Sequence, residues 1–274
     1  MLAKRIITSL VLAPIMIGGI FFLPLHQFAL FIGVIVVFGG WEWANLAGWS
    51  SIAQRLVYVA FLVVVMAGIY FSRNQFPALM TYILWCAFAW WAVAFFMVAK
   101  FPETPNGLFK TGTQLSIGLI VLVPMWVGLY QLKLNPNSTL WIIYLMFVVW
   151  GADVGAYFVG KAIGKRKLAP KVSPGKSWEG VMGGTVCVLM VATVAGLYFS
   201  QNGGFSIQSW IALFVISVVV MASSILGDLV ESMFKRHRGV KDSSNILPGH
   251  GGVLDRADSL TSSVPVFALL LNFI

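Results

Sequence analysis

Nine long apolar segments dominate this sequence and decide the environment in which it folds. A helix of about 20 residues crosses the roughly 30 Å of hydrocarbon in a bilayer. Because 59% of the residues are hydrophobic and 10% are charged, a water-soluble domain of this length is excluded. We therefore expect an all-α, polytopic integral membrane protein with about nine transmembrane helices. The expected spans are Ile6–Leu23, Phe28–Leu46, Leu56–Phe71, Phe76–Ala99, Leu115–Leu132, Thr139–Gly160, Val181–Ser200, Ile207–Val230 and Leu260–Ile274.

The basic residues test that count independently, because cytoplasmic loops of membrane proteins carry an excess of lysine and arginine. With the N-terminus inside, 16 of the 18 basic residues fall on the inner side, and the outer loops hold Arg73 and Lys133. The inner residues are Lys4, Arg5, Arg55, Lys100, Lys110, Lys161, Lys165, Arg166, Lys167, Lys171, Lys176, Lys235, Arg236, Arg238, Lys241 and Arg256. This split predicts a cytoplasmic N-terminus. The first apolar run is long and lacks a signal-peptide cleavage site, so we expect it to be retained.

Acidic residues are concentrated in the second half of the chain. Glu42 and Glu103 lie in the first half, and the other seven of nine fall between Asp153 and Asp258. We therefore expect residues 1–132 to form a lipid-facing scaffold and residues 133–274 to form the catalytic region. In that second region we expect two cytoplasmic loops, 161–180 and 231–258.

The two cysteines and the net charge exclude other classes of protein. Cys86 and Cys187 lie inside apolar runs, so neither a disulfide framework nor a thiolate metal site is indicated. The net charge of +9 is explained by membrane sidedness, since no basic stretch is interleaved with aromatic residues as in nucleic-acid-binding domains. We expect no nucleic-acid partner.

The segment SSILGDLVESMFKR, residues 223–236, places several polar side chains on one face of a helix. Steps of three or four residues lead from Asp228 to Glu231 or Ser232 and on to Lys235. An unpaired carboxylate at the boundary of an apolar span is costly and usually has a function. The alternative is an ion pair of Asp228 within the helix, with Lys235 or Arg236.

Asp255 and Asp258 share one face of a further helix if that helix begins near Leu254. Like charges so close together repel unless a cation lies between them. Arg256 points elsewhere on the helix, so we expect a metal as their partner, with Asp228 completing the ligand set. Carboxylates without cysteine or paired histidine favour Mg²⁺. Neighbouring basic residues that would neutralise phosphates are Lys235, Arg236, Lys241 and Arg256.

Three further polar segments bear on this site. His250 lies in PGHGG, where glycines allow close approach of the backbone to a ligand. Asp153 is a carboxylate within a span and is flanked by small residues, so it is either part of the site or a buried structural hydrogen-bonding group. The loop SPGKSWEG contains Ser173, Lys176 and Glu179. Pro170 stands where a P-loop needs glycine, so no Walker motif is present.

Together these residues resemble the phosphatidate cytidylyltransferase family, also called CDP-diacylglycerol synthase. The family signature is matched at every polar position of SMFKRHRGVKDSSNILPGHGGVLDRAD, residues 232–258. Further similar segments are DVGAY at 153–157, SPGKSWEG at 173–180 and GDLVES at 227–232. The resemblance covers about residues 150–262, and the first half agrees only in being a run of membrane helices.

The resemblance implies that phosphatidate and CTP give CDP-diacylglycerol and pyrophosphate at the cytoplasmic face. In that reaction Asp228, Asp255 and Asp258 are expected to hold Mg²⁺, with K⁺ or another Mg²⁺ as a second cation. Lys235, Arg236, Lys241 and Arg256 are expected to bind phosphates, and Asp242 and His250 to orient them. Asp153, Ser173, Lys176 and Glu179 are expected to complete the substrate site.

Other functions fit the sequence less well. A cation-coupled transporter requires carboxylates near the middle of the bilayer and repeat symmetry, whereas here the acids cluster at one face and no repeat is detected. A CDP-alcohol phosphotransferase requires a D-G-x-x-A-R pattern, which is absent. The compact length favours a bacterial inner-membrane enzyme that works among membrane lipids. A homodimer is one open option for its oligomeric state.

Overall fold

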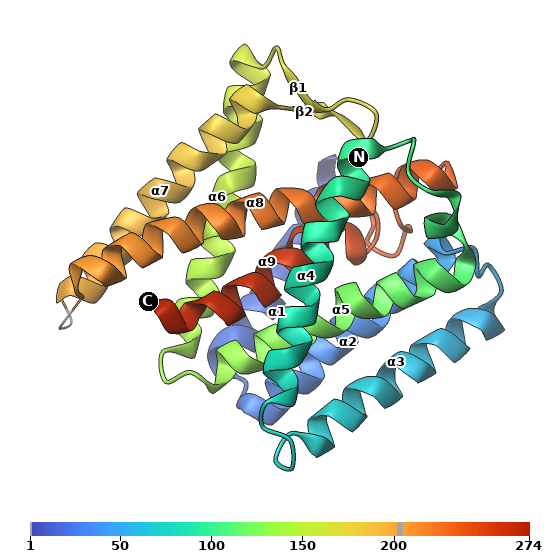
Figure 1. The fold of residues 1–274 in the computed structure, drawn as a ribbon, viewed down its shortest axis with the longest axis horizontal. Helices are drawn as coiled ribbons and strands as arrows, with labels where there is room; N and C mark the ends of the chain where they lie inside the picture. The colour runs from blue at the N-terminus through green and yellow to red at the C-terminus, as the bar shows by residue number, and fades with distance from the viewer. Residues whose placement is uncertain (1, 202–204) are drawn as a thin grey trace.

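The computed structural model describes residues 2–201 and 205–274. The side chains of residues 1–7 and 9 lie outside that description, and with them Lys4 and Arg5 of the basic-residue count. The described residues form long helices and one short antiparallel hairpin, so the predicted all-α fold class is confirmed (Figure 1). The helices are α1 (Leu2–Phe22), α2 (Leu25–Leu46), α3 (Ile52–Ser72), α4 (Leu79–Lys100), α5 (Thr111–Leu134), α6 (Ser138–Ile163), α7 (Trp178–Gln201), α8 (Ile207–Arg238) and α9 (Leu254–Leu270). Short 3₁₀ helices cover Asn106–Phe109 and Leu271–Phe273, and the hairpin strands are β1 (Lys167–Ala169) and β2 (Ser173–Ser177).

Each predicted span corresponds to one of these helices, but not every helix can cross a membrane alone. In the described part of the chain, seven helices, α2 to α8, are long and apolar enough to do so. The apolar part of α1 covers Leu10–Phe22 only. Helix α9 has 17 residues and a first turn that carries charged groups, and most of its length is buried against other helices. The chain is thus a multi-pass membrane protein in which α9 is an internal element of the bundle.

Local sequence signals explain several helix ends. Ser51 accepts a hydrogen bond from the Gln54 N–H in a capping box that begins α3. Ser206 caps α8 by accepting a hydrogen bond from the Ser209 N–H, and Gly239 ends α8 in the left-handed conformation that favours glycine. The expected loop 231–258 is therefore too long, because helix α8 continues through Arg238 and the connecting loop covers residues 239–253.

Close helix contacts hold the second half of the chain together. Helices α6 and α7 pack along their length as an antiparallel pair (Figure 1). A Cβ atom added to Gly155 would lie 2.5 Å from the Gly183 carbonyl oxygen, so the two backbones touch. This confirms that the small residues around Asp153 permit close packing. Helices α8 and α9 pack closely too, and a Cβ atom on Gly227 would lie 2.5 Å from the Asp258 carbonyl oxygen.

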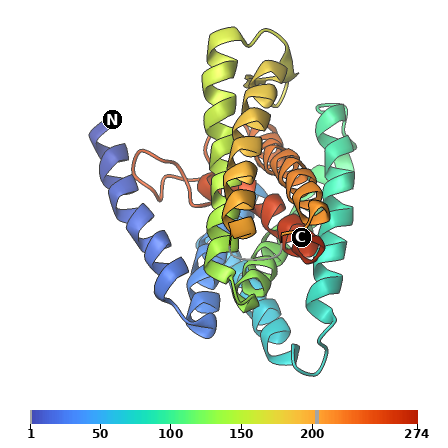
Figure 2. The same cartoon turned by 90° about the vertical axis from the view of Figure 1, so that its left-hand side faces the viewer.

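The N-terminus, the β1–β2 hairpin and the end of α4 lie at the same end of the bundle in both views (Figures 1 and 2). Helix α1 stands apart from the other helices, and the loop between α8 and α9 extends toward it (Figure 2). The Thr8 hydroxyl donates a hydrogen bond of 2.9 Å to the Pro248 carbonyl oxygen in that loop. The charged segments are thus gathered at one end.

Candidate active site

The hairpin between α6 and α7 delivers Lys176 to helix α8. Its Nζ lies 2.7 Å from Oδ2 of Asp228, and the two side chains remain 24% and 29% exposed. We call Lys176 and Asp228 the hairpin pair. A pocket of about 320 Å³ lies beside it, and its lining includes Asp153, Ser173, Lys176, Tyr157 and Ile225. Three sequence segments that lie far apart along the chain therefore meet at one partly open pocket.

Asp153 and Ser173 line this pocket, as expected for residues of a substrate site, whereas Glu179 has a structural role. Asp153 is within electrostatic reach of both Lys176 and Asp228. The Glu179 carboxylate accepts hydrogen bonds from the Lys165 and Arg166 N–H groups and from Arg166 Nε. These hydrogen bonds of Glu179 stabilise the base of the hairpin, and Glu179 is not among the residues that line the pocket.

The predicted stripe along α8 is present. Ser232 Oγ donates to Asp228 Oδ1 over 3.1 Å, and Lys235 Nζ donates to Glu231 Oε2 over 3.1 Å. The alternative of an intrahelical ion pair between Asp228 and Lys235 or Arg236 is not realised, because the lysine partner of Asp228 comes from the hairpin. The two acids of α8 therefore have different lysine partners: Asp228 pairs with Lys176 of the hairpin, and Glu231 pairs with Lys235 of the same helix.

Asp255, in the first turn of α9, has a lysine partner where the sequence led us to expect a metal. Lys235 Nζ lies 2.6 Å from Asp255 Oδ1, and the side chains are 9% and 5% exposed. We call Lys235 and Asp255 the buried pair. Asp255 Oδ2 accepts hydrogen bonds from the Gly252 N–H, the Ser243 N–H and the Ser243 hydroxyl, at 2.7, 2.9 and 2.9 Å. Burial alone raises the pKa of Asp255, but Lys235 and these donors outweigh burial and hold it below its ordinary value.

Asp258 lies one turn further along α9 and faces the acids of α8. It is within electrostatic reach of Asp228, and its carboxyl group lies against that of Glu231. The contact between Gly227 and the Asp258 backbone explains this proximity, since only glycine lets the two helices approach so closely. Asp228 and Asp258 thus lie within electrostatic reach of each other, while Asp255 is turned to Lys235, and metal binding by the three aspartates stays a prediction.

This cluster holds more acidic groups than basic ones. Five carboxylates, those of Asp153, Asp228, Glu231, Asp255 and Asp258, share the two lysines of the hairpin pair and the buried pair. Oε1 of Glu231 is buried and receives no donor from the described residues. Among those residues, no three acidic, histidine or cysteine side chains already converge as a ready ligand set. The excess of acidic groups over lysines and the orphaned oxygen fit a bound cation.

Of the remaining predicted residues, His250 is half-buried and four are exposed; we call these four the rim, namely Arg236, Lys241, Asp242 and Arg256. Arg236 Nε donates to the Val172 carbonyl oxygen over 3.3 Å and so links α8 to the hairpin. Arg256 Nε donates to the His250 carbonyl oxygen over 3.2 Å. Lys241 and Asp242 are exposed in the loop 239–253. Neither His250 nor any rim residue lines the pocket beside the hairpin pair. Phosphate binding by Arg236, Lys241 and Arg256, and phosphate orientation by Asp242 and His250, therefore stay predictions.

Glu42 is the site residue that sequence reasoning missed. It lies on α2, in the region expected to be scaffold, and its side chain is fully buried. Its carboxylate accepts hydrogen bonds from Ser243, Ser244, Val253 and Leu254, all in or next to the loop 239–253. The signal was available, because a carboxylate inside an apolar span was the reason for selecting Asp153.

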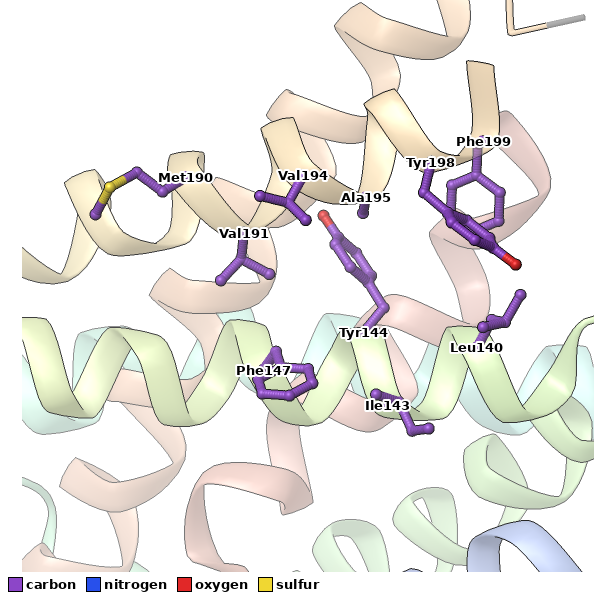
Figure 3. Close-up of a pocket in the computed structure, with 10 residues that line it drawn as sticks. All are labelled: Leu140, Ile143, Tyr144, Phe147, Met190, Val191, Val194, Ala195, Tyr198 and Phe199. Carbon is purple, nitrogen blue, oxygen red and sulfur yellow. The ribbon is translucent and has the colours of Figure 1, made fainter. Parts of the chain in front are cut away.

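A second pocket is apolar and separate from these charges. It has a volume of about 460 Å³ and lies between α6 and α7 (Figure 3). Leu140, Phe147, Met190 and Phe199 are among its lining residues, and Tyr144 and Tyr198 supply the only hydroxyl groups in the set shown. No carboxylate, lysine, arginine or histidine is among its lining residues, so its contacts are mainly apolar.

Comparison with known proteins agrees with the gathered motifs. The family model described as "Cytidylyltransferase family" matches residues 3–274. A phosphatidate cytidylyltransferase of Pseudomonas aeruginosa is 50% identical over 99% of this chain and 97% of its own length. One of Haemophilus influenzae is 39% identical over the full length of both chains. One of Bacillus subtilis is 44% identical over 57% of this chain and 58% of its own length.

Proposed function

The chain belongs to the cytidylyltransferase family, and on that premise we propose that it transfers the cytidylyl group of CTP to phosphatidate, giving CDP-diacylglycerol and pyrophosphate. The observation that carries the proposal is the full-length similarity to two proteins named phosphatidate cytidylyltransferase. A cation-coupled transporter, the rival function from the sequence, has no support from these relatives. The proposed enzyme acts in phospholipid synthesis and has CTP, phosphatidate and membrane lipids as its partners.

The hairpin pair supports this function because both proposed substrates are polyanions. Their mutual repulsion is the main barrier to reaction, so positive charge and fixed positions supply most of the catalysis in phosphoryl-type transfer. Lys176 points to the pocket from the hairpin and is held there by Asp228. When a substrate phosphate approaches, Lys176 exchanges its partly hydrated carboxylate partner for a phosphate oxygen.

The transfer is a substitution at the α-phosphorus of CTP. A phosphate oxygen of phosphatidate forms the new P–O bond, the bond between the α-phosphorus and the bridging oxygen breaks, and pyrophosphate leaves with that electron pair. No covalent bond to the protein is required. Lys176 neutralises phosphate charge at the pocket, and the rim residues Arg236, Lys241 and Arg256 are proposed to hold the remaining phosphate oxygens, with Asp242 and His250 orienting them.

Mg²⁺ is part of the proposal. Asp228 and Asp258 are its proposed ligands, with Glu231 beside them, whose Oε1 receives no donor from the described residues. When bound, Mg²⁺ would neutralise phosphate charge and make the α-phosphorus more electrophilic. Asp255 was expected to be a third ligand, but its four hydrogen bonds favour a role in holding Lys235. The excess of carboxylates leaves room for a second cation, K⁺ or another Mg²⁺.

We also propose that the site faces the cytoplasm across a bacterial inner membrane. The hairpin and the N-terminus lie at the same end of the bundle, as the distribution of basic residues requires (Figures 1 and 2). CTP is a cytoplasmic metabolite, so a site at this end meets its nucleotide substrate directly. Cysteines placed in the hairpin and in the loop between α3 and α4 should therefore be labelled from opposite sides of sealed vesicles.

The central experiment follows two labels in separate reactions. The purified protein is mixed in detergent with phosphatidate, MgCl₂ and CTP labelled at either the α- or the γ-phosphate. We expect the α-label to enter the lipid phase and the γ-label to appear as pyrophosphate, and EDTA to stop both. Absence of the α-label from the lipid with active substrate and metal present would refute the proposed function. Activity that survives EDTA would refute the Mg²⁺ requirement alone.

A further inference from the structure

Glu42 anchors the loop 239–253 and the start of α9 to helix α2. Oε1 accepts hydrogen bonds from the Ser244 hydroxyl at 2.5 Å and from the Val253 N–H at 2.9 Å. Oε2 accepts from the Leu254 N–H at 2.6 Å and from the Ser243 hydroxyl at 3.2 Å. A carboxylate that is fully buried and fully hydrogen-bonded holds four groups of another segment in one arrangement.

The helix itself explains why a carboxylate suits this position. The first N–H groups of a helix have no partner within the helix, and the helix dipole makes its N-terminus favourable for negative charge. Helix α9 begins at Leu254, and no side chain of its own caps that end. Glu42 supplies the missing acceptor from a helix more than 200 residues away in the sequence. Among the described residues it forms no salt bridge, so hydrogen-bond donors and the dipole stabilise its charge.

Ser243 connects Glu42 to the buried pair. Its hydroxyl lies within hydrogen-bonding distance of both Glu42 Oε2 and Asp255 Oδ2, at 3.2 and 2.9 Å. Since a hydroxyl has one proton, it donates to one carboxylate at a time, while the Ser243 N–H donates to Asp255. A continuous path of contacts thus runs from Glu42 through Ser243 and Asp255 to Lys235.

The space around Glu42 is closed. A Cβ atom on Gly252 would lie 2.6 Å from Glu42 Oε1 and 2.0 Å from Ser243 Oγ, closer than any side chain tolerates. A Cβ atom on Gly251, which has a φ of +83°, would lie 2.7 Å from Asp255 Oδ2. The two glycines therefore allow the loop backbone to wrap directly around the two carboxylates.

We propose that Glu42 is a positioning residue for the active site. It fixes the first turn of α9 and residues 243–244, so that Asp255 holds Lys235 and Asp258 faces Asp228. This inference rests on the proposed function for its kinetic consequence, although the contacts themselves do not depend on it. Glu42 touches no pocket residue, and its effect on turnover is exerted through Asp255 and Asp258.

Two substitutions separate the charge of Glu42 from its size. Glu42→Gln keeps the shape, but it replaces one carboxylate oxygen, which accepts from two donors, with an NH₂ group that cannot accept. Glu42→Asp keeps the carboxylate and shortens the side chain. We expect Glu42→Gln to lower kcat at least tenfold and to change KM for CTP less than threefold. Glu42→Asp should retain more of kcat than Glu42→Gln does. A role in filling space predicts the reverse order, since Gln fills the site better than Asp.

A double-substitution cycle tests the path through Ser243. Glu42→Gln combined with Ser243→Ala should cost less than the sum of the two single effects, because both act on the same contact with Asp255. With Thr193→Ala, on α7, where the hydroxyl bonds only the Leu189 carbonyl oxygen and contacts neither Glu42 nor Asp255, the effects should add. Additive effects in the first combination would remove the proposed path. Glu103→Gln, at an exposed carboxylate in the same half of the chain, is the matched control and should behave like the unaltered protein.

Hydrogen exchange tests the same inference without any assay of activity. In Glu42→Gln the amides of Ser243, Val253 and Leu254 should exchange at least tenfold faster, while those of the β1–β2 hairpin stay unchanged. Unchanged exchange at these amides, or equal kcat for Glu42→Gln and the unaltered protein, would overturn the positioning role. If the unaltered protein fails to transfer cytidylyl groups, the proposed function fails, and hydrogen exchange still decides whether Glu42 holds α9.

Discussion

Two lysine–aspartate pairs lie in the same site and have almost the same contact distance, but their surroundings differ. The hairpin pair, Lys176 with Asp228, is separated by 2.7 Å, and both side chains are about one quarter exposed. The buried pair, Lys235 with Asp255, is separated by 2.6 Å, and both side chains are less than one tenth exposed. In the hairpin pair the aspartate has one further donor, Ser232, whereas Asp255 has three.

The difference shows that the role of an ion pair does not follow from its residue types and contact distance alone. A partly exposed ion pair contributes little to stability, so a polyanionic ligand can open it at small cost. A buried pair with its hydrogen bonds satisfied cannot be opened cheaply, because each separated charge would be left without solvent. The hairpin pair is therefore suited to meet substrate, and the buried pair is suited to hold α8 against α9.

The largest effect is expected from Asp255→Asn, which breaks the buried pair. Removing one partner of a buried ion pair typically costs about 3–5 kcal/mol. We therefore expect the unfolding midpoint in detergent to fall sharply and activity to fall with it. Thermal unfolding followed by circular dichroism measures this, with Glu103→Gln as the exposed control. A variant that unfolds like the unaltered protein but lacks activity would instead favour the metal-ligand role that the sequence predicted for Asp255.

The next effect concerns the other member of the comparison, Asp228→Asn. The amide preserves shape and the contact with Ser232, but removes the charge that Lys176 and a bound cation require. We expect kcat to fall roughly 10²–10³-fold, the usual cost of losing one electrostatic group at a transition state. The unfolding midpoint should change little. Large destabilisation with modest loss of turnover would show that the hairpin pair, too, is structural.

Features set by local sequence were predictable in this protein. The spacing of Asp228, Ser232 and Lys235 placed them on one face of α8, because helical periodicity depends only on neighbours in the sequence. The start of α9 at Leu254 and the packing of small residues around Asp153 followed from equally local signals. The loop after α8 was expected to begin at residue 231, too early, because the final turns of α8 through Arg238 lack the apolar signal of the span.

Choices of partner between distant segments were not predictable. Lys176 and Lys235 have the same chemistry in the sequence, and only the packing of the hairpin and α9 decides which aspartate each one meets. Metal was expected between Asp255 and Asp258 because like charges so close together repel and Arg256 points elsewhere on the helix. Glu42 stood alone in an apolar span, and the donors that explain it come from residues 243–254.

A smaller effect is expected from Lys176→Met, which keeps the length of the side chain and removes its charge. If Lys176 meets a substrate phosphate, KM for CTP or phosphatidate should rise about tenfold, equivalent to about 1.4 kcal/mol. The matched control is Lys171→Met, an exposed lysine in the same hairpin that contacts Glu103 at 3.9 Å. An equal rise of KM in both variants would point to general attraction of anions, and added salt would then abolish the difference from the unaltered protein.

The smallest effect is expected from Glu179→Gln, which loosens the hairpin without altering either pair. Glu179 holds the Lys165 and Arg166 N–H groups near the surface, and exposed contacts of this kind contribute little to stability. Because the hairpin carries Lys176 but not Lys235, loosening it should raise KM a few-fold and leave the unfolding midpoint unchanged. Measuring KM and the unfolding midpoint on the same sample separates an effect on substrate binding from an effect on stability. Destabilisation approaching that of Asp255→Asn would mean that the hairpin supports the bundle, and the contrast between an openable pair and a structural pair would then disappear.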